Sequence, residues 1–133
     1  MIDMRELLQS HIEEAYSRDM VWGVDDCTSW VAAWVERLAG RAVKRPNWSS
    51  EAEALQLVAG AGSLDALWDE VMAENGYREA ISPERGDVGI IAIREKQVGG
   101  IFLSGGYFAW RGEPRGVAIL RPRDIVRAWA IIR

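Results

Sequence analysis

The spacing of apolar residues changes once along this chain, and that change is the strongest constraint on its fold. Over residues 4–75 apolar side chains recur every three or four positions, as on one face of a helix. From residue 88 onward they fall in short β-branched and aromatic runs separated by Gly and Pro, which is typical of strands. Helices followed by consecutive strands indicate an α+β fold, with N-terminal helices packed on a C-terminal antiparallel sheet or meander.

Caps and breakers locate the expected elements within one domain spanning residues 1–133. Asp3 and Glu6 form a potential capping box for the first helix, and Gly40 ends the second. The expected helices are 4–18, 27–39, 51–59 and 64–75. The expected strands are 88–93, 98–103, 107–111, 117–120 and 128–132, with a short helical turn at 122–127.

Composition excludes several classes of protein. The net charge of −4 argues against a nucleic-acid-binding protein, which usually has a basic face. No apolar run reaches the roughly 20 residues that cross a bilayer, and no signal peptide is visible. Acidic residues outnumber basic ones in residues 1–77, and the reverse holds in 78–133. The two halves either complement each other within the domain or favour head-to-tail contact with a neighbour.

The single cysteine, Cys27, lies in the stretch VWGVDDCTSW, where a loop is expected to become a helix. Unpaired N–H groups and the helix dipole at that point favour a thiolate. Asp25 and Asp26 oppose this because nearby negative charge raises the pKa of a thiol, and either acid could cap the helix. Cys27 also falls on the apolar stripe of the helix, so core packing is an equally physical interpretation.

Other chemistry finds little support in the sequence. The only histidine, His11, lies one position off the apolar stripe of the first helix and is the one imidazole that could serve Cys27 as a base. One Cys and one His do not make a zinc site, so we expect no metal. Paired glycines between the strands match neither a P-loop nor a dinucleotide fingerprint, so we expect no cofactor.

Five of the seven tryptophans divide into two groups. Trp30, Trp34 and Trp68 fall on helix faces that we expect to be buried. Trp48 lies in a predicted loop, and Trp110 stands beside Arg111 at a predicted strand end. Exposed aromatic and arginine side chains anchor partner proteins, so Trp48, Trp110 and Arg111 are candidate partner-binding residues.

Several motifs together resemble the NlpC-like branch of the papain-like cysteine peptidases. Trp22-Gly23 and Asp26-Cys27 match the start of the nucleophile helix in that family, and Arg85–Val88 matches the entry into its first core strand. The likeness extends over about residues 15–133 and is greatest to short phage- and prophage-encoded proteins with the same W-G-x-x-D-C start. This resemblance implies a papain-like fold in which Cys27 occupies the nucleophile position.

One departure from the family pattern bears directly on activity. The catalytic histidine of active members opens the second core strand, where this chain has Gln97. Glutamine cannot accept a proton from a thiol near neutral pH, so a nucleophile at Cys27 would lack its base. Thr28 also replaces a small residue beside the cysteine. The resemblance therefore implies a vestigial site made of Trp22, Gly23, Asp26, Thr28 and Gln97.

Three functions follow as hypotheses. The first is a catalytically degenerate domain that serves as a structural or assembly protein of a phage tail, made without a signal peptide in the bacterial cytoplasm and bound to other tail proteins in the virion. The second is an active peptidoglycan endopeptidase or amidase with Cys27 as nucleophile and His11 as base. The third is a peptide or small-molecule binder that uses the former substrate groove.

Overall fold

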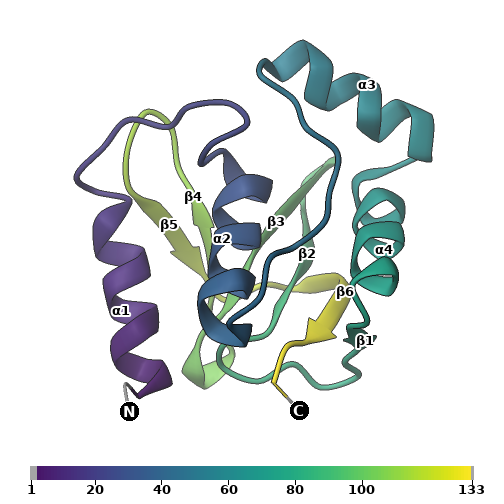
Figure 1. Ribbon diagram of the computed structural model, residues 1–133. Coiled ribbons are helices and arrows are strands. Elements are labelled where there is room, and N and C mark those ends of the chain that lie inside the picture. Colours follow the sequence, from purple (N-terminus) through teal and green to yellow (C-terminus); the bar gives the residue numbers. More distant parts are fainter. Residues whose placement is uncertain (1–2, 133) are drawn as a thin grey trace.

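The computed structural model describes residues 3–132 and confirms the α+β architecture (Figure 1). The helices are α1 (Met4–Glu14), α2 (Cys27–Ala39), α3 (Glu51–Ala61) and α4 (Leu64–Glu74). The strands are β1 (Arg78–Glu79), β2 (Val88–Ile93), β3 (Lys96–Phe102), β4 (Phe108–Arg111), β5 (Val117–Leu120) and β6 (Asp124–Ala130), with a short 3₁₀ turn η1 (Ser104–Gly106) before β4. Of the domain expected over 1–133, residues 1–2 and 133 lie outside the described part.

Side-chain caps explain where three of the helices begin. Asp26, Ser50 and Ser63 each accept a hydrogen bond from the backbone N–H three residues further on. Gly40 ends α2 in the left-handed conformation, with φ of 75°, as the sequence predicts. The local signals therefore place the start of α2, and with it Cys27, correctly.

Two expectations about α1 are wrong. The side chain of Asp3 makes no capping hydrogen bond, so the predicted capping box does not form. The helix ends at Glu14 instead of residue 18. The carbonyl of Ala15 accepts a hydrogen bond from the N–H of Gly116 in the β4–β5 turn, and this long-range bond takes the place of a further helical turn.

The sheet is antiparallel throughout, in the order β1-β6-β2-β3-β4-β5. Strands β2 to β5 form the predicted meander, and β6 then returns to pair with the free side of β2. The helical turn expected at 122–127 is wrong, because Ile125 pairs with Ile91 and Arg127 with Ile90. Pairing with β6 gives hydrogen-bond partners to the backbone N–H and C=O groups on the free side of β2. Local propensity contains no information on such a long-range contact.

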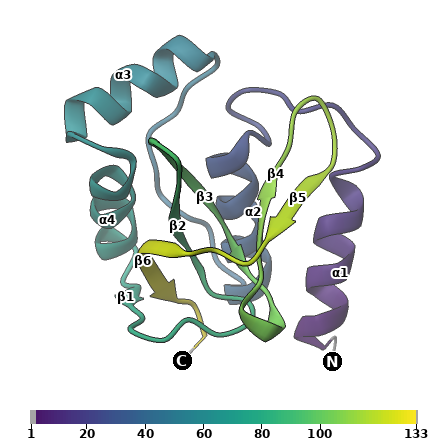
Figure 2. The same cartoon turned by 180° about the vertical axis from the view of Figure 1, so that it is seen from behind.

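The connection between β5 and β6 shows that the sheet is strongly curled (Figure 2). These strands lie on opposite sides of the ladder β6-β2-β3-β4-β5, yet only residues 121–123 join them. Four residue steps span at most about 14 Å. The outer strands of a flat five-stranded ladder would lie about 19 Å apart. The short link therefore requires the sheet to curl toward a barrel.

Two glycines make room for aromatic rings inside the curl. A Cβ on Gly89 would lie 2.7 Å from the ring of Phe102, and one on Gly100 would lie 2.6 Å from the ring of Phe108. The two rings meet edge to face, with centroids 5.0 Å apart. The buried cluster inside the curl draws its members from strands alone: Ile91, Phe102, Phe108 and Ala128.

Helices α1, α2 and α4 cover the outer face of the sheet (Figures 1 and 2). Trp30 and Trp34 of α2 are fully buried there, and the indole N–H of Trp34 donates to the carbonyl of Gly86 at 2.8 Å. Trp68 of α4 packs against Trp129 of β6, with ring centroids 5.9 Å apart. The predicted burial of Trp30, Trp34 and Trp68 is confirmed.

We predict that Gly100→Ala destabilises the domain by about 1–3 kcal/mol, the usual cost of overpacking a core. The added Cβ would lie 2.2 Å from the carbonyl oxygen of Ala109, and backbone cannot rotate away as a side chain can. Urea denaturation followed by tryptophan fluorescence measures the change. Gly60→Ala is the matched control, because a Cβ there meets nothing within 4 Å. Equal stability of the two variants would contradict this account of the curl.

Candidate functional site

The N-terminus of α2 is built on the buried carboxylate of Asp26. It accepts hydrogen bonds from the N–H of Gly23 at 2.6 Å, the indole N–H of Trp48 at 2.8 Å, and both the N–H and the hydroxyl of Ser29 at 3.1 and 2.9 Å. The sequence allows either Asp25 or Asp26 as the N-cap of α2, and in the structure the cap is Asp26. One side chain thus joins the preceding turn, the helix and a distant loop.

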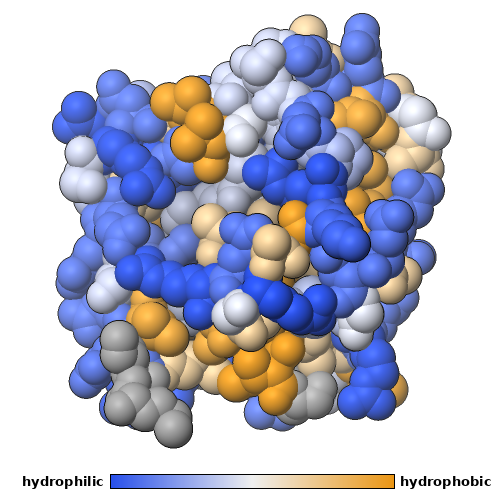
Figure 3. Space-filling model, viewed as in Figure 1, coloured by the Kyte–Doolittle hydropathy of each residue, from blue (hydrophilic) through white to orange (hydrophobic). Residues whose placement is uncertain are grey.

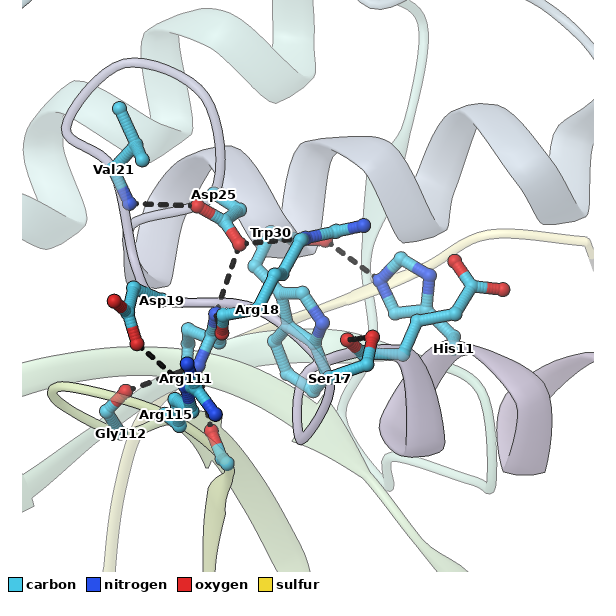
Figure 4. Close-up of polar contacts among 12 residues, drawn as sticks. His11, Ser17, Arg18, Asp19, Val21, Asp25, Trp30, Arg111, Gly112 and Arg115 are labelled. Atoms are coloured by element: carbon cyan, nitrogen blue, oxygen red, sulfur yellow. Dashed lines mark hydrogen bonds and ion pairs between the residues drawn. The ribbon is translucent and has the colours of Figure 1, made fainter.

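The neighbouring acid, Asp25, ties the same turn to the sheet (Figure 4). Its carboxylate accepts from Arg111 and from Arg18, both at 2.9 Å, and from the N–H of Val21 at 2.8 Å. Burial alone would raise the pKa of Asp25, but these hydrogen bonds, Arg111 foremost, hold the pKa below its usual value. The two consecutive acids therefore have separate structural roles.

Cys27 is partly exposed, so it is not the fully buried core residue that its place on the helix stripe allows. Burial of the sulfur, and next the negative charge of Asp26, raise the pKa of the thiol. Polar interactions with Thr28 and with the backbone of Gly99 lower this pKa, but by less. The balance favours the protonated, weakly nucleophilic form.

Cys27 lies on the floor of a cleft of about 760 Å³. The walls come from four places: the turn before α2, helix α3, the start of α4 and the β2–β3 turn. More than half of the lining side chains are apolar, and each wall also carries polar ones. The lining comprises Trp22, Asp26, Cys27, Thr28, Trp48, Glu51, Ala54, Leu55, Leu57, Val58, Ser63, Leu64, Leu67, Glu95, Lys96, Gln97 and Val98. Figure 3 shows apolar side chains gathered over α3 at the upper right.

Gln97 shares this cleft with Cys27 but is engaged by another group. Its carbonyl oxygen accepts from the N–H of Asp65, and its amide N–H₂ donates to the carboxylate of Asp65, both at 3.0 Å. The carboxylate of Asp65 is also paired with Arg127 at 3.3 Å. Gln97 therefore fastens the start of α4 to β3, which is a structural use of the position.

His11 and Cys27 are not brought together. The Nε2 atom of His11 lies 2.9 Å from the carbonyl oxygen of Trp30 and must carry the proton, because a carbonyl only accepts. Nδ1 faces a guanidinium nitrogen of Arg37 at 3.4 Å, and the ring stacks on Trp30 (Figure 4). Burial lowers the pKa of His11. The imidazole is thus a neutral packing group between α1 and α2, and it does not line the cleft.

The other residues of the predicted vestigial site lie around the cleft. Trp22 and Thr28 line it, and the hydroxyl of Thr28 accepts from the indole N–H of Trp68 at 3.2 Å. Gly23 adopts a φ of 84°, and a Cβ there would lie 1.9 Å from the carbonyl oxygen of Trp48. Only glycine allows the turn and the loop to approach this closely.

Two of the three predicted partner-binding residues are buried and need a correction. Trp48 is only 8% exposed, because its indole N–H is bound to Asp26. Arg111 is 3% exposed, because its guanidinium is bound to Asp25 and to nearby carbonyls. Trp110 is half-buried and packs beside Phe108. The expectation that Trp48 and Arg111 are exposed is therefore wrong. Both side chains are buried because acids distant in the sequence accept their hydrogen bonds.

Sequence reasoning also missed two parts of the site. Asp65, the partner of Gln97, is visible in the sequence only as an acid in the first turn of α4. The apolar residues of α3, among them Leu55, Leu57 and Val58, form one wall of the cleft, yet their spacing indicates only an amphipathic helix. Neither contact has a local signal, because each joins segments that are distant in the sequence.

A family model described as a domain of unknown function, DUF6950, matches residues 1–131. The chain belongs to this family. No curated protein matches the sequence. Residues 3–132 of this DUF6950 domain contain no group of three or more His, Cys, Asp or Glu side chains that could hold a metal ion. None of the helices in that part is long and apolar enough to cross a membrane.

We predict that Asp25→Asn costs about 3 kcal/mol near neutral pH, because it leaves the buried Arg111 without its anion. The pKa of Asp25 is depressed in the folded state, so its contribution is present above the unfolded pKa and is lost as the pH falls through the folded one. Urea denaturation over a pH series should therefore show a weaker loss of stability in acid for the variant than for the wild type. Asp19→Asn is the control, since its pair with Arg115 is exposed and should matter little.

We also predict that Cys27 alkylates more slowly than free cysteine near neutral pH, with an apparent pKa above that of an ordinary thiol. Asp26→Asn should lower this pKa, because it removes the charge and keeps an oxygen for the cap. The pH dependence of iodoacetamide labelling, read by mass spectrometry, measures both values without ambiguity because the chain has one cysteine. A depressed thiol pKa would contradict the electrostatics described above.

Proposed function

We propose that this DUF6950 domain is a non-catalytic binding domain that serves as a structural or assembly protein of a phage or prophage tail. It would use the cleft over Cys27 to hold a segment of another tail protein. The expected cysteine-peptidase-like, NlpC-like origin explains why a thiol stands at the start of a helix facing an open cleft. This origin is part of the proposal and rests on the sequence motifs.

The surroundings of Cys27 carry the proposal. By the sequence resemblance, Gln97 corresponds to the catalytic histidine of active NlpC-like peptidases, and both ends of its amide are bound to Asp65. The single imidazole, His11, is bound to Trp30. The pKa of the thiol is raised, whereas a cysteine nucleophile needs a lowered pKa or an adjacent base. With Gln97 and Asp26 both engaged by structural hydrogen bonds, the surroundings of Cys27 suit recognition better than proton transfer.

The shape and chemistry of the cleft support a protein segment as its ligand. The walls supply apolar side chains and the indole of Trp22, and polar side chains such as Thr28 and Gln97 stand among them. Such a groove holds apolar side chains and orients them through a few polar contacts. The resemblance to short phage-encoded proteins points to other tail proteins as the source of that segment.

One observation favours the alternative, an active cysteine hydrolase that cuts peptidoglycan. Cys27 is partly exposed on the floor of an open cleft, at the N-terminus of α2. A substrate carbonyl could meet helix N–H groups there as it does in an oxyanion hole. In that case a base must come from a group outside the contacts described for Cys27.

Co-purification and cross-linking with phage tail proteins test the proposed function. We expect binding that Trp22→Ala weakens, because the indole lines the cleft, and that Cys27→Ser leaves unchanged, because the thiol does no chemistry. Incubation with peptidoglycan should release no peptides that depend on Cys27. Absence of both co-purification and cross-links would refute the assembly role, and Cys27-dependent release would establish the hydrolase instead.

A further inference from the structure

Helix α3 is packed differently from the other helices. None of its residues is buried, whereas α1, α2 and α4 each bury at least two. It stands apart from the layered body and makes its main contact with α4 (Figure 1). Yet its sequence, EAEALQLVAGA, is largely apolar, and Leu55 is 61% exposed. Its apolar side chains Ala54, Leu57 and Val58 are only half-buried, so covering them further would be favourable.

The apolar side of α3 faces an apolar surface across the cleft. Ala54, Leu57 and Val58 of α3 line one wall of the cleft. Leu64 and Leu67 of α4 line another. The turn before α2 adds Trp22, and β3 adds Val98. Bringing these walls together would remove apolar surface from water, which is favourable. The surface that covers α3 is therefore present within the same chain.

Both ends of α3 are attached to fixed points. On the N-terminal side, Trp48 is anchored to Asp26 by its indole N–H. On the C-terminal side, Asp65 is fastened to β3 by its two hydrogen bonds with Gln97. Within these limits the helix itself is a rigid unit, since Ser50 caps it and Glu53 accepts from Ser49.

Glycines mark the C-terminal end of α3. Gly60 lies in the last turn of the helix and Gly62 caps it, and a Cβ at either would meet nothing within 4 Å. Gly62 has a φ of 105°, in the region that glycine tolerates. At the other end only Ser49 separates the anchored Trp48 from the cap of α3. A few residues at element ends are the usual site of hinge rotation.

From these observations we infer that α3 is a strap that closes over the cleft by rotating about hinges at residues 48–49 and 60–62, and that its closed position covers Cys27. The structure describes the open position. Closure concerns the cleft of the proposed function but needs no ligand, so the inference and the proposed function can fail separately.

Pairs of spin labels on the full chain test the motion directly, with Cys27→Ser as background. Labels at Gln56→Cys on α3 and Glu95→Cys on the β2–β3 turn should give a broad distance distribution with a component shorter than the open structure allows. The reference pair, Glu70→Cys on α4 with Glu95→Cys, should give one narrow distance. Gly60→Ala should narrow the first distribution by stiffening the hinge. A single narrow distance for the α3 pair would overturn the inference.

The reactivity of Cys27 gives a second, independent test. Leu57→Asp places a charge on the face that closure buries, so it should hold the strap open and raise the iodoacetamide labelling rate several-fold. An added carboxylate acting on the thiol through space would raise the thiol pKa and slow labelling, so the two effects have opposite signs. Gln56→Asp, outside the lining of the cleft, is the matched control and should leave the rate unchanged. An unchanged or slower rate in Leu57→Asp would overturn the inference.

Discussion

The buried carboxylate of Asp26 is the interaction on which the site depends. It accepts hydrogen bonds from the turn at Gly23, the first turn of α2 and the indole of Trp48. Each donor would otherwise be buried without a partner, which costs more than a hydrogen bond gains. This arrangement places Cys27 on the floor of the cleft. The same negative charge raises the pKa of the thiol. The carboxylate of Asp26 thus holds the site together and also disfavours the thiolate form of Cys27.

The surrounding contacts fix the floor of the cleft, and helix α3 is the wall that we infer to move. Asp25 fastens the turn before α2 to the sheet through Arg111, and Gln97 fastens α4 to β3 through Asp65. Among the four α-helices within residues 3–132, α3 alone has no buried residue. A rigid floor beneath an apolar wall that is packed less tightly suits the recognition of a protein segment.

Local patterns predicted those elements whose signals are local. The start of α2 at its cap, its end at Gly40 and the strands Val88–Ile93 and Val117–Leu120 all agree with the structure. The errors fall where a distant partner decides. Residues 122–127 pair with β2 instead of turning, and α1 ends where Ala15 binds the β4–β5 turn. Trp48 and Arg111 are buried because acids elsewhere in the chain accept their hydrogen bonds.

The sequence by itself determined the α+β class, a thiol at the start of a helix and the lack of any histidine after residue 11. Those features depend on residue type and on spacing within one element. Tertiary structure alone decided that Gln97 shares the cleft with Cys27 and that His11 donates its hydrogen bond to the carbonyl of Trp30. It also decided that α3 lines the cleft without burying any of its residues. Periodicity reports which side chains leave water, but the choice of partner depends on how distant segments meet in space.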